Sequence, residues 1–125
     1  MMVQPIRVLI VDDQPRARKS LKALLSTWPR ASEIREASNG QDAVQLVREL
    51  QPDVVLMDVR MPEMDGLKAT VQIKALWPHV KVVILSMYPE YRAEALAVGA
   101  DAFVVKGEDP DKLLDLLSAV MQRGV

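Results

Sequence analysis

Cysteine is absent from this sequence, and His79 is its single histidine. Without cysteine the chain can form no disulfide, no thiolate metal site and no cysteine nucleophile. His79 lies before an apolar run and has no partner motif, so we do not assign it as a general base. The absence of cysteine fits a reducing compartment, and we expect a cytoplasmic protein.

Long apolar runs are also missing. The longest are far too short to cross a membrane, and the N-terminus lacks the charged region and cleavage site of a signal peptide. Charge of one sign is not in excess, because 16 Lys and Arg face 17 Asp and Glu for a net charge of −1. With no basic stripe, the chain has no pattern for direct binding to a nucleic-acid backbone. We therefore expect contact with neither membrane nor DNA by this chain itself.

What the sequence does contain is enough apolar material for one core. Half of its 125 residues are hydrophobic, and no internal repeat divides it. This length is typical of one domain, which we assign to residues 1–125. Short apolar runs rich in β-branched residues alternate with amphipathic stretches. The runs predict five strands, of which the second is the most polar and suits a sheet edge: 6–11, 33–37, 54–57, 80–85 and 102–105.

The amphipathic stretches predict five helices, four of them over 16–28, 41–50, 66–77 and 90–98. The fifth begins after Asp109, with Pro110 in its first turn. The helix over 90–98 is rich in alanine and has few large apolar residues, so we expect it to pack least firmly. Five β-α repeats predict an α/β, flavodoxin-like three-layer sandwich, with helices on both faces of a parallel sheet in the order 2-1-3-4-5.

Polar side chains follow four of the predicted strands directly. They are Asp12 and Asp13 after the first strand, Asp58 after the third, Ser86 after the fourth and Lys106 after the fifth. The carboxyl ends of parallel strands meet at one sheet edge, so these side chains should converge. Three carboxylates there repel one another, and a hard divalent cation such as Mg²⁺ removes the conflict. The backbone carbonyl of Arg60 can turn toward the same ion.

The same edge offers groups that suit a phosphoryl group. Lys106 supplies a positive charge and Ser86 a hydroxyl donor, around a phosphate carried on one of the carboxylates. Any one of these residues alone is more often a helix cap, a turn residue or a lysine that reaches solvent. Their occurrence on four strand ends favours a functional site over that structural interpretation.

Four segments carry a resemblance to a known family. They are VLIVDD (8–13), LMDVRMPEMDG (56–66), ILSM (84–87) and GADAFVVKG (99–107). With them, essentially the whole chain resembles the receiver domain of bacterial two-component response regulators. The resemblance implies that Asp58 accepts a phosphoryl group from a histidine kinase or phosphotransfer protein, and that the phosphorylated form can dimerise.

The resemblance also implies the roles of the other site residues. Asp13, Asp58 and the backbone carbonyl of Arg60 would ligate Mg²⁺, with Asp12 acting through water. Ser86 and Lys106 would bind the phosphoryl oxygens, and Ser86 would act with Phe103, at the aromatic position, as the switch.

Three positions depart from the commonest pattern of the family: Met87, Phe103 and Gly107. Together they resemble the subfamily whose output is a helix-turn-helix DNA-binding domain, so control of transcription is implied. No such domain lies in these 125 residues. The chain is therefore either a receiver taken from a longer protein or a single-domain protein, and DNA would be reached only through an output domain outside it.

Three rival functions remain to be compared with this one. An aspartate-based Mg²⁺ phosphohydrolase typically needs a second carboxylate two residues after the nucleophile, where this chain has Arg60. A doubly wound nucleotide-binding domain needs a glycine-rich loop, which the first strand does not lead into. A receiver that serves only as a scaffold does not need the intact acidic set. We therefore expect a regulatory domain, not an enzyme, whose chemistry is limited to its own phosphorylation and dephosphorylation.

Overall fold

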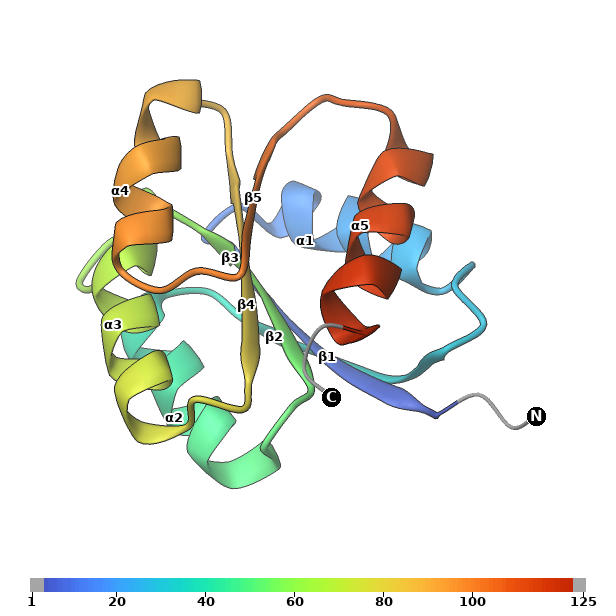
Figure 1. Cartoon of the computed structure of the whole chain (residues 1–125), viewed down its shortest axis with the longest axis horizontal. Helices are drawn as coiled ribbons and strands as arrows, with labels where there is room; N and C mark the ends of the chain where they lie inside the picture. Colours follow the sequence, from blue (N-terminus) through green and yellow to red (C-terminus); the bar gives the residue numbers. More distant parts are fainter. Residues whose placement is uncertain (1–3, 123–125) are drawn as a thin grey trace.

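Five parallel strands form the centre of the molecule. The computed structural model describes residues 4–122, and its sheet has the order β2-β1-β3-β4-β5 (Figure 1). The strands are β1 (Ile6–Val11), β2 (Ala31–Ala37), β3 (Val54–Asp58), β4 (Lys81–Ser86) and β5 (Ala102–Val105). This order confirms the flavodoxin-like fold that the alternating pattern predicts.

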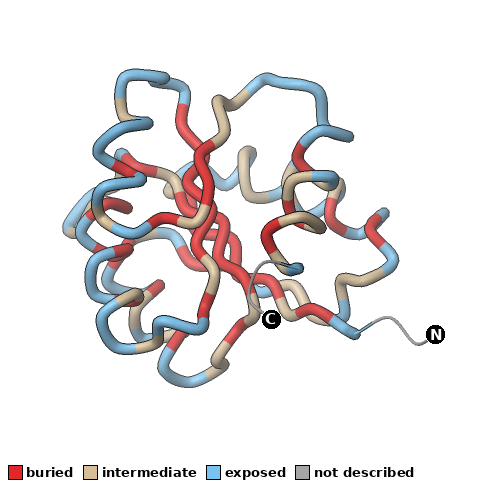
Figure 2. Tube along the Cα trace, in the orientation of Figure 1, coloured by how far each residue is buried: buried red, intermediate tan, exposed pale blue. Residues whose placement is uncertain are grey.

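Helices cover both faces of the sheet. They are α1 (Pro15–Leu25), α2 (Gly40–Leu50), α3 (Gly66–Leu76), α4 (Arg92–Ala97) and α5 (Pro110–Gln122), with a short 3₁₀ turn η1 (Pro89–Tyr91) before α4. Figure 1 shows α2, α3 and α4 on one face and α1 and α5 on the other. Of the strands between them, β1, β3 and β4 are buried along most of their length, whereas the edge strand β2 is mostly open (Figure 2). Among residues 4–122, none of the helices combines the length and the apolar content that a membrane span requires.

Each face of the sheet has its own apolar core. Leu9, Val55 and Ile73 belong to the core under α2, α3 and α4. Ile10, Leu56 and Leu117 belong to the core under α1 and α5. Neighbouring residues of one strand enter opposite cores because strand side chains alternate between the two faces. This double burial explains why the central strands consist almost entirely of apolar residues.

Several predicted element boundaries are wrong by a few residues. Three strands are longer or shifted: β2 starts at Ala31, β3 includes Asp58, and β4 spans Lys81–Ser86 rather than 80–85. Asp58 pairs with Leu85 and Ser86 with Val105, so main-chain pairing with the neighbouring strand extends beyond the apolar run.

The helix boundaries also differ from the predicted ones. The first helix covers Pro15–Leu25 rather than 16–28, because tight turns occupy the following residues: Thr27 N donates to the carbonyl of Leu24 (3.0 Å), and Trp28 N to that of Leu25 (3.0 Å). The second starts one residue earlier, and the third ends at Leu76 rather than 77. The segment 90–98 is not one helix but η1 followed by the six-residue α4.

Helix caps and one glycine shape the loop after β3. Asp65 caps α3, and its carboxylate accepts a hydrogen bond from Lys68 N (2.9 Å). At Gly66, any Cβ would lie 1.8 Å from the backbone oxygen of Asp58. Only glycine therefore lets the start of α3 approach the end of β3 this closely, which brings the loop over the carboxyl edge of the sheet.

Candidate functional site

Three carboxylates meet at the carboxyl edge of the sheet. Asp12 and Asp13 follow β1, and Asp58 is the last residue of β3. One carboxylate oxygen from each lies within 4.8 Å of the others. Adjacent positions of β1 and β3 in the sheet order place them there, and the sequence pattern predicts this convergence.

Lys106 lies among these carboxylates. Its Nζ donates to Asp12 Oδ2 at 2.7 Å and lies 3.4 Å from Asp58 Oδ1. Its backbone N–H donates to the carbonyl of Ser86 (2.8 Å), which anchors the end of β5 against the end of β4. Burial lowers the pKa of Lys106, but the hydrogen bond to Asp12 and the attraction of both aspartates outweigh this and raise it. The ammonium is therefore charged at neutral pH.

Asp12 and Asp13 differ in their surroundings. Asp12 is 1% exposed, and its second oxygen, Oδ1, accepts a hydrogen bond from Gln14 N (2.9 Å). Both Asp12 oxygens are thus engaged by the protein. Asp13 is half-buried and is the more open of the two. This contrast favours Asp13 over Asp12 as a direct metal ligand.

Asp58 has an environment that opposes its ionisation. Burial raises its pKa above the ordinary value, and the neighbouring charge of Asp12 adds to this, while Lys106 acts in the opposite direction. One ammonium faces three carboxyl groups, so the edge is short of positive charge. Oxygen ligands in this number and this charge balance fit a hard divalent cation.

Ser86 ends β4 beside this cluster. It is 1% exposed, and its hydroxyl oxygen accepts a hydrogen bond from Tyr88 N (3.0 Å). Met87, the next residue, is 63% exposed and so lies mostly in solvent. The loop after β4 therefore holds the Ser86 hydroxyl through its backbone and not through the methionine side chain.

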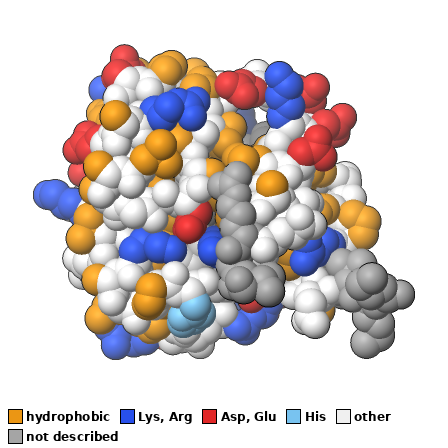
Figure 3. Space-filling model, viewed as in Figure 1, with side chains coloured by type: hydrophobic (Ala, Val, Ile, Leu, Met, Phe, Trp, Pro, Cys, Tyr) orange, Lys and Arg blue, Asp and Glu red, His pale blue; other side chains and the backbone are white. Residues whose placement is uncertain are grey.

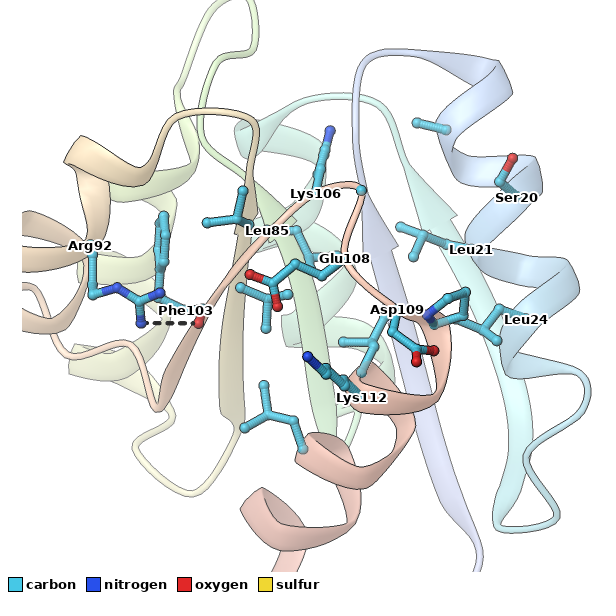
Figure 4. Close-up of a pocket in the computed structure, with 17 residues that line it drawn as sticks. Ser20, Leu21, Leu24, Leu85, Arg92, Phe103, Lys106, Glu108, Asp109 and Lys112 are labelled. Atoms are coloured by element: carbon cyan, nitrogen blue, oxygen red, sulfur yellow. Dashed lines mark hydrogen bonds between the residues drawn. The ribbon is translucent and has the colours of Figure 1, made fainter.

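Phe103 lies on β5 and is already buried, at 6% exposure. The guanidinium of Arg92, from the first turn of α4, lies 4.9 Å from the centre of its ring and contacts the Phe103 carbonyl (Figure 4). Both residues line a cavity of about 550 Å³ that runs across β5 to α1 and α5. On the surface view, acidic side chains gather near the turn from β5 to α5 (Figure 3), where Glu108 and Asp109 lie in the turn and Asp111 in the first turn of α5.

The side-chain contacts of three arginines around the site were not predicted from the sequence. Arg18, on α1, donates to the carbonyl of Asp12 (2.7 Å). Arg92 covers Phe103, and the guanidinium of Arg60 stacks on Tyr88 (4.0 Å). For the contact of Arg60, the sequence offers one signal: Tyr91 follows Tyr88 by three residues, which suggests an aromatic pair. Such pairs do not by themselves indicate which cation they bind.

A doubly wound sheet with clustered carboxylates and a lysine at its switch point defines a class of phosphoryl-accepting regulatory domains. Residues 8–118 match the response regulator receiver domain family, and the chain belongs to that family. It is 42% identical to the response regulator protein VraR of Staphylococcus saprophyticus over 106 residues. This aligned region covers 82% of this chain and 50% of VraR. With the nitrate/nitrite response regulator protein NarL of Escherichia coli the identity is 35%, over 91% of this chain and 54% of NarL.

Solved structures give the same result. A two-component response regulator of the LuxR family from Aurantimonas superposes with a TM-score of 0.91 at 29% identity, covering 96% of this chain and 87% of the other. The signal receiver domain of the putative response regulator NarL from Mycobacterium tuberculosis gives 0.89 at 27% identity, covering 95% and 98%. The chain spans about half the length of the curated relatives it matches. The predicted resemblance to receivers of DNA-binding regulators is confirmed.

Proposed function

We propose that this receiver takes a phosphoryl group onto Asp58 and that the change at its surface controls an output domain or partner. The observation that supports this most directly is the grouping of Asp12, Asp13, Asp58 and Lys106 at one sheet edge. The donor would be the phosphohistidine of a kinase or phosphotransfer protein. An Asp58 oxygen would attack the phosphorus, and the P–N bond to the donor histidine would break.

The surrounding groups have separate roles in this proposal. Asp13, Asp58 and the Arg60 carbonyl would hold Mg²⁺, with Asp12 acting through water; when bound, the ion supplies positive charge to the phosphoryl oxygens. Lys106 would pair with a phosphoryl oxygen, having its charge already placed 3.4 Å from Asp58. Ser86 would donate its hydroxyl hydrogen to another oxygen, and Phe103 would respond to that movement.

The output and the location of the protein also belong to this proposal. The relatives are transcriptional regulators about twice as long as this chain, so we propose that DNA is reached only through an output domain outside these 125 residues. A homodimer of the phosphorylated form and a cytoplasmic location stay predictions. Arg60, in place of a second carboxylate, argues against turnover of external phosphoesters.

Labelling with a small acyl phosphate tests the acceptor. Wild-type protein with Mg²⁺ should gain the mass of one phosphoryl group, and Asp58→Asn should gain none, because the amide cannot attack. Asp115→Asn serves as the control, since Asp115 is exposed on α5. Equal labelling of wild type and Asp58→Asn in the mass spectrum would overturn the assignment.

A further inference from the structure

Three side chains join the loop after β3 to the loop after β4. The guanidinium of Arg60 lies 4.0 Å from the centre of the Tyr88 ring, and Arg60 Nε donates to the Tyr91 hydroxyl at 3.3 Å. The two tyrosine rings meet edge to face, with centroids 6.1 Å apart and an angle of 88° between their planes. We call these three residues the Arg60 clasp.

The clasp contacts both halves of the proposed site. Arg60 is two residues beyond Asp58 in the loop that leads to α3. Tyr88 is two residues beyond Ser86, and its backbone N–H donates to the Ser86 hydroxyl oxygen. A movement of that hydroxyl toward Asp58 must therefore break or drag the bond to Tyr88, whose ring is held by Arg60.

Little else anchors the loop after β4. Residues 87–90 are all exposed, and Met87 and Tyr88 keep 63% and 40% of their surface in solvent. The helix that follows, α4, buries only Ala95. A contact between exposed side chains can decide the position of a loop when no buried residue fixes it. Tyr91 packs partly against the apolar core, and the clasp adds a direct tie between this loop and the acceptor side.

We propose that the Arg60 clasp holds the β4–α4 loop in the unphosphorylated conformation and has to open when Asp58 carries a phosphoryl group. This proposal rests on the function proposed above. A contact made in only one of two states stabilises that state, so its removal shifts the resting population toward the other. By linkage, removal of the contact also increases, by the same factor, the affinity for any ligand that selects the other state.

Beryllofluoride with Mg²⁺ serves as the phosphoryl mimic in the test. Tyr88→Leu removes the stack without changing charge, and we expect it to bind the mimic about two- to fivefold more tightly, the range for one exposed cation–π contact. Tyr91→Phe keeps the ring but removes the hydroxyl, and should act in the same direction by less. The backbone NMR signals of residues 87–98 in both resting variants should move toward their positions in mimic-saturated wild type.

Two further variants separate the clasp from simple charge effects. Arg60→Ala should also bind the mimic more tightly if the clasp is a restraint, but more weakly if Arg60 only attracts the anion. Arg48→Ala is the matched control, because Arg48 stacks on Trp77 at 5.4 Å, away from the site, and its loss should leave affinity unchanged.

The outcomes distinguish the two proposals. If wild type itself fails to bind the mimic, the proposed function is wrong. If wild type binds but Tyr88→Leu and Tyr91→Phe match it in affinity and in resting NMR shifts, the clasp is not a restraint. Weaker binding by Arg60→Ala with unchanged tyrosine variants would likewise overturn the clasp and assign Arg60 a purely electrostatic effect.

Discussion

Asp58 is a partly buried carboxylate that is costly to ionise, and it is also the proposed phosphoacceptor. It ends a strand whose other residues are fully buried, and burial is the main reason that its pKa is raised. Lys106 offsets this only in part, because its shortest contact is to Asp12 at 2.7 Å and not to Asp58 at 3.4 Å. Without a metal, the ionised Asp58 carboxylate therefore destabilises the folded protein.

This leads to a pH-dependent stability difference in metal-free protein. Below the ordinary pKa of 3.8, Asp58 is protonated in both the unfolded and the folded protein. Above the raised pKa of the folded state, Asp58 is ionised in both, and the folded protein carries the full cost of that charge. The Asp58 contribution to stability is thus lost as pH rises through that window. Asp58→Asn should be more stable than wild type at neutral pH, and the difference should shrink on acidification. Urea unfolding in EDTA over this range measures it.

The control for this experiment is Asp115→Asn, whose carboxylate is exposed on α5. It removes one carboxylate, as Asp58→Asn does, but from an exposed position outside the cluster. If the stability difference between Asp58→Asn and wild type does not change with pH, the surroundings of Asp58 do not penalise its charge.

At the scale of elements, α4 stands apart from the other helices. It has six residues, and the only one that it buries is an alanine. By contrast, α5 has thirteen residues and buries Leu113, Leu117 and Val120. A short helix with so little buried apolar surface opens at low free energy. The sequence predicts this weakness from the alanine-rich composition, although it does not predict that a 3₁₀ turn replaces the first part of the helix.

Hydrogen exchange should show this difference directly. We expect the amides of α4 to exchange at least about tenfold faster than the central amides of α5, equivalent to ~1.4 kcal/mol less protection. Both helices are measured in one sample, so α5 serves as the internal control. Equal protection of the two helices would mean that α4 opens only with the whole molecule.

At the scale of the whole molecule, the cluster couples metal binding to folding. The three carboxylates come from two strands that are brought together only by the folded sheet. A cation that binds them selects the native state and stabilises it, by about 2.7 kcal/mol at a hundred times its Kd. The shortage of positive charge around Asp58 makes this effect larger than at a site with balanced charges.

Mg²⁺ should therefore raise the stability of wild type toward unfolding, and the two neighbouring aspartates should differ in this effect. Asp13→Ala should lose most of the increment, because Asp13 is the open carboxylate. Asp12→Ala should lower the metal-free stability more, since it leaves Lys106 without its closest partner, but retain more of the increment. Denaturant unfolding followed by tryptophan fluorescence, with and without Mg²⁺, gives both quantities; equal increments in the two variants would contradict this division of roles.

The pattern along the chain is sufficient to predict the layered fold and which side chains meet at the carboxyl edge of the sheet. Alternating apolar runs specify buried parallel strands, and parallel strands bring their carboxyl ends to one edge, so Asp12, Asp58, Ser86 and Lys106 could be grouped in advance. The capping residue Asp65 and the start of α5 were also predictable, because caps and proline act over a few neighbouring residues. These are consequences of local periodicity and chain geometry.

The partners that those side chains take depend on the packing of the whole folded molecule. It pairs Lys106 more closely with Asp12 than with Asp58, directs Arg18 to a backbone carbonyl, and stacks Arg60 on Tyr88. It also ends strands and helices a few residues away from their apolar patterns, where ladder bonds or turns continue. These outcomes depend on contacts between residues far apart in the chain, and a long flexible side chain can reach several alternative partners until the packing of the loops selects one.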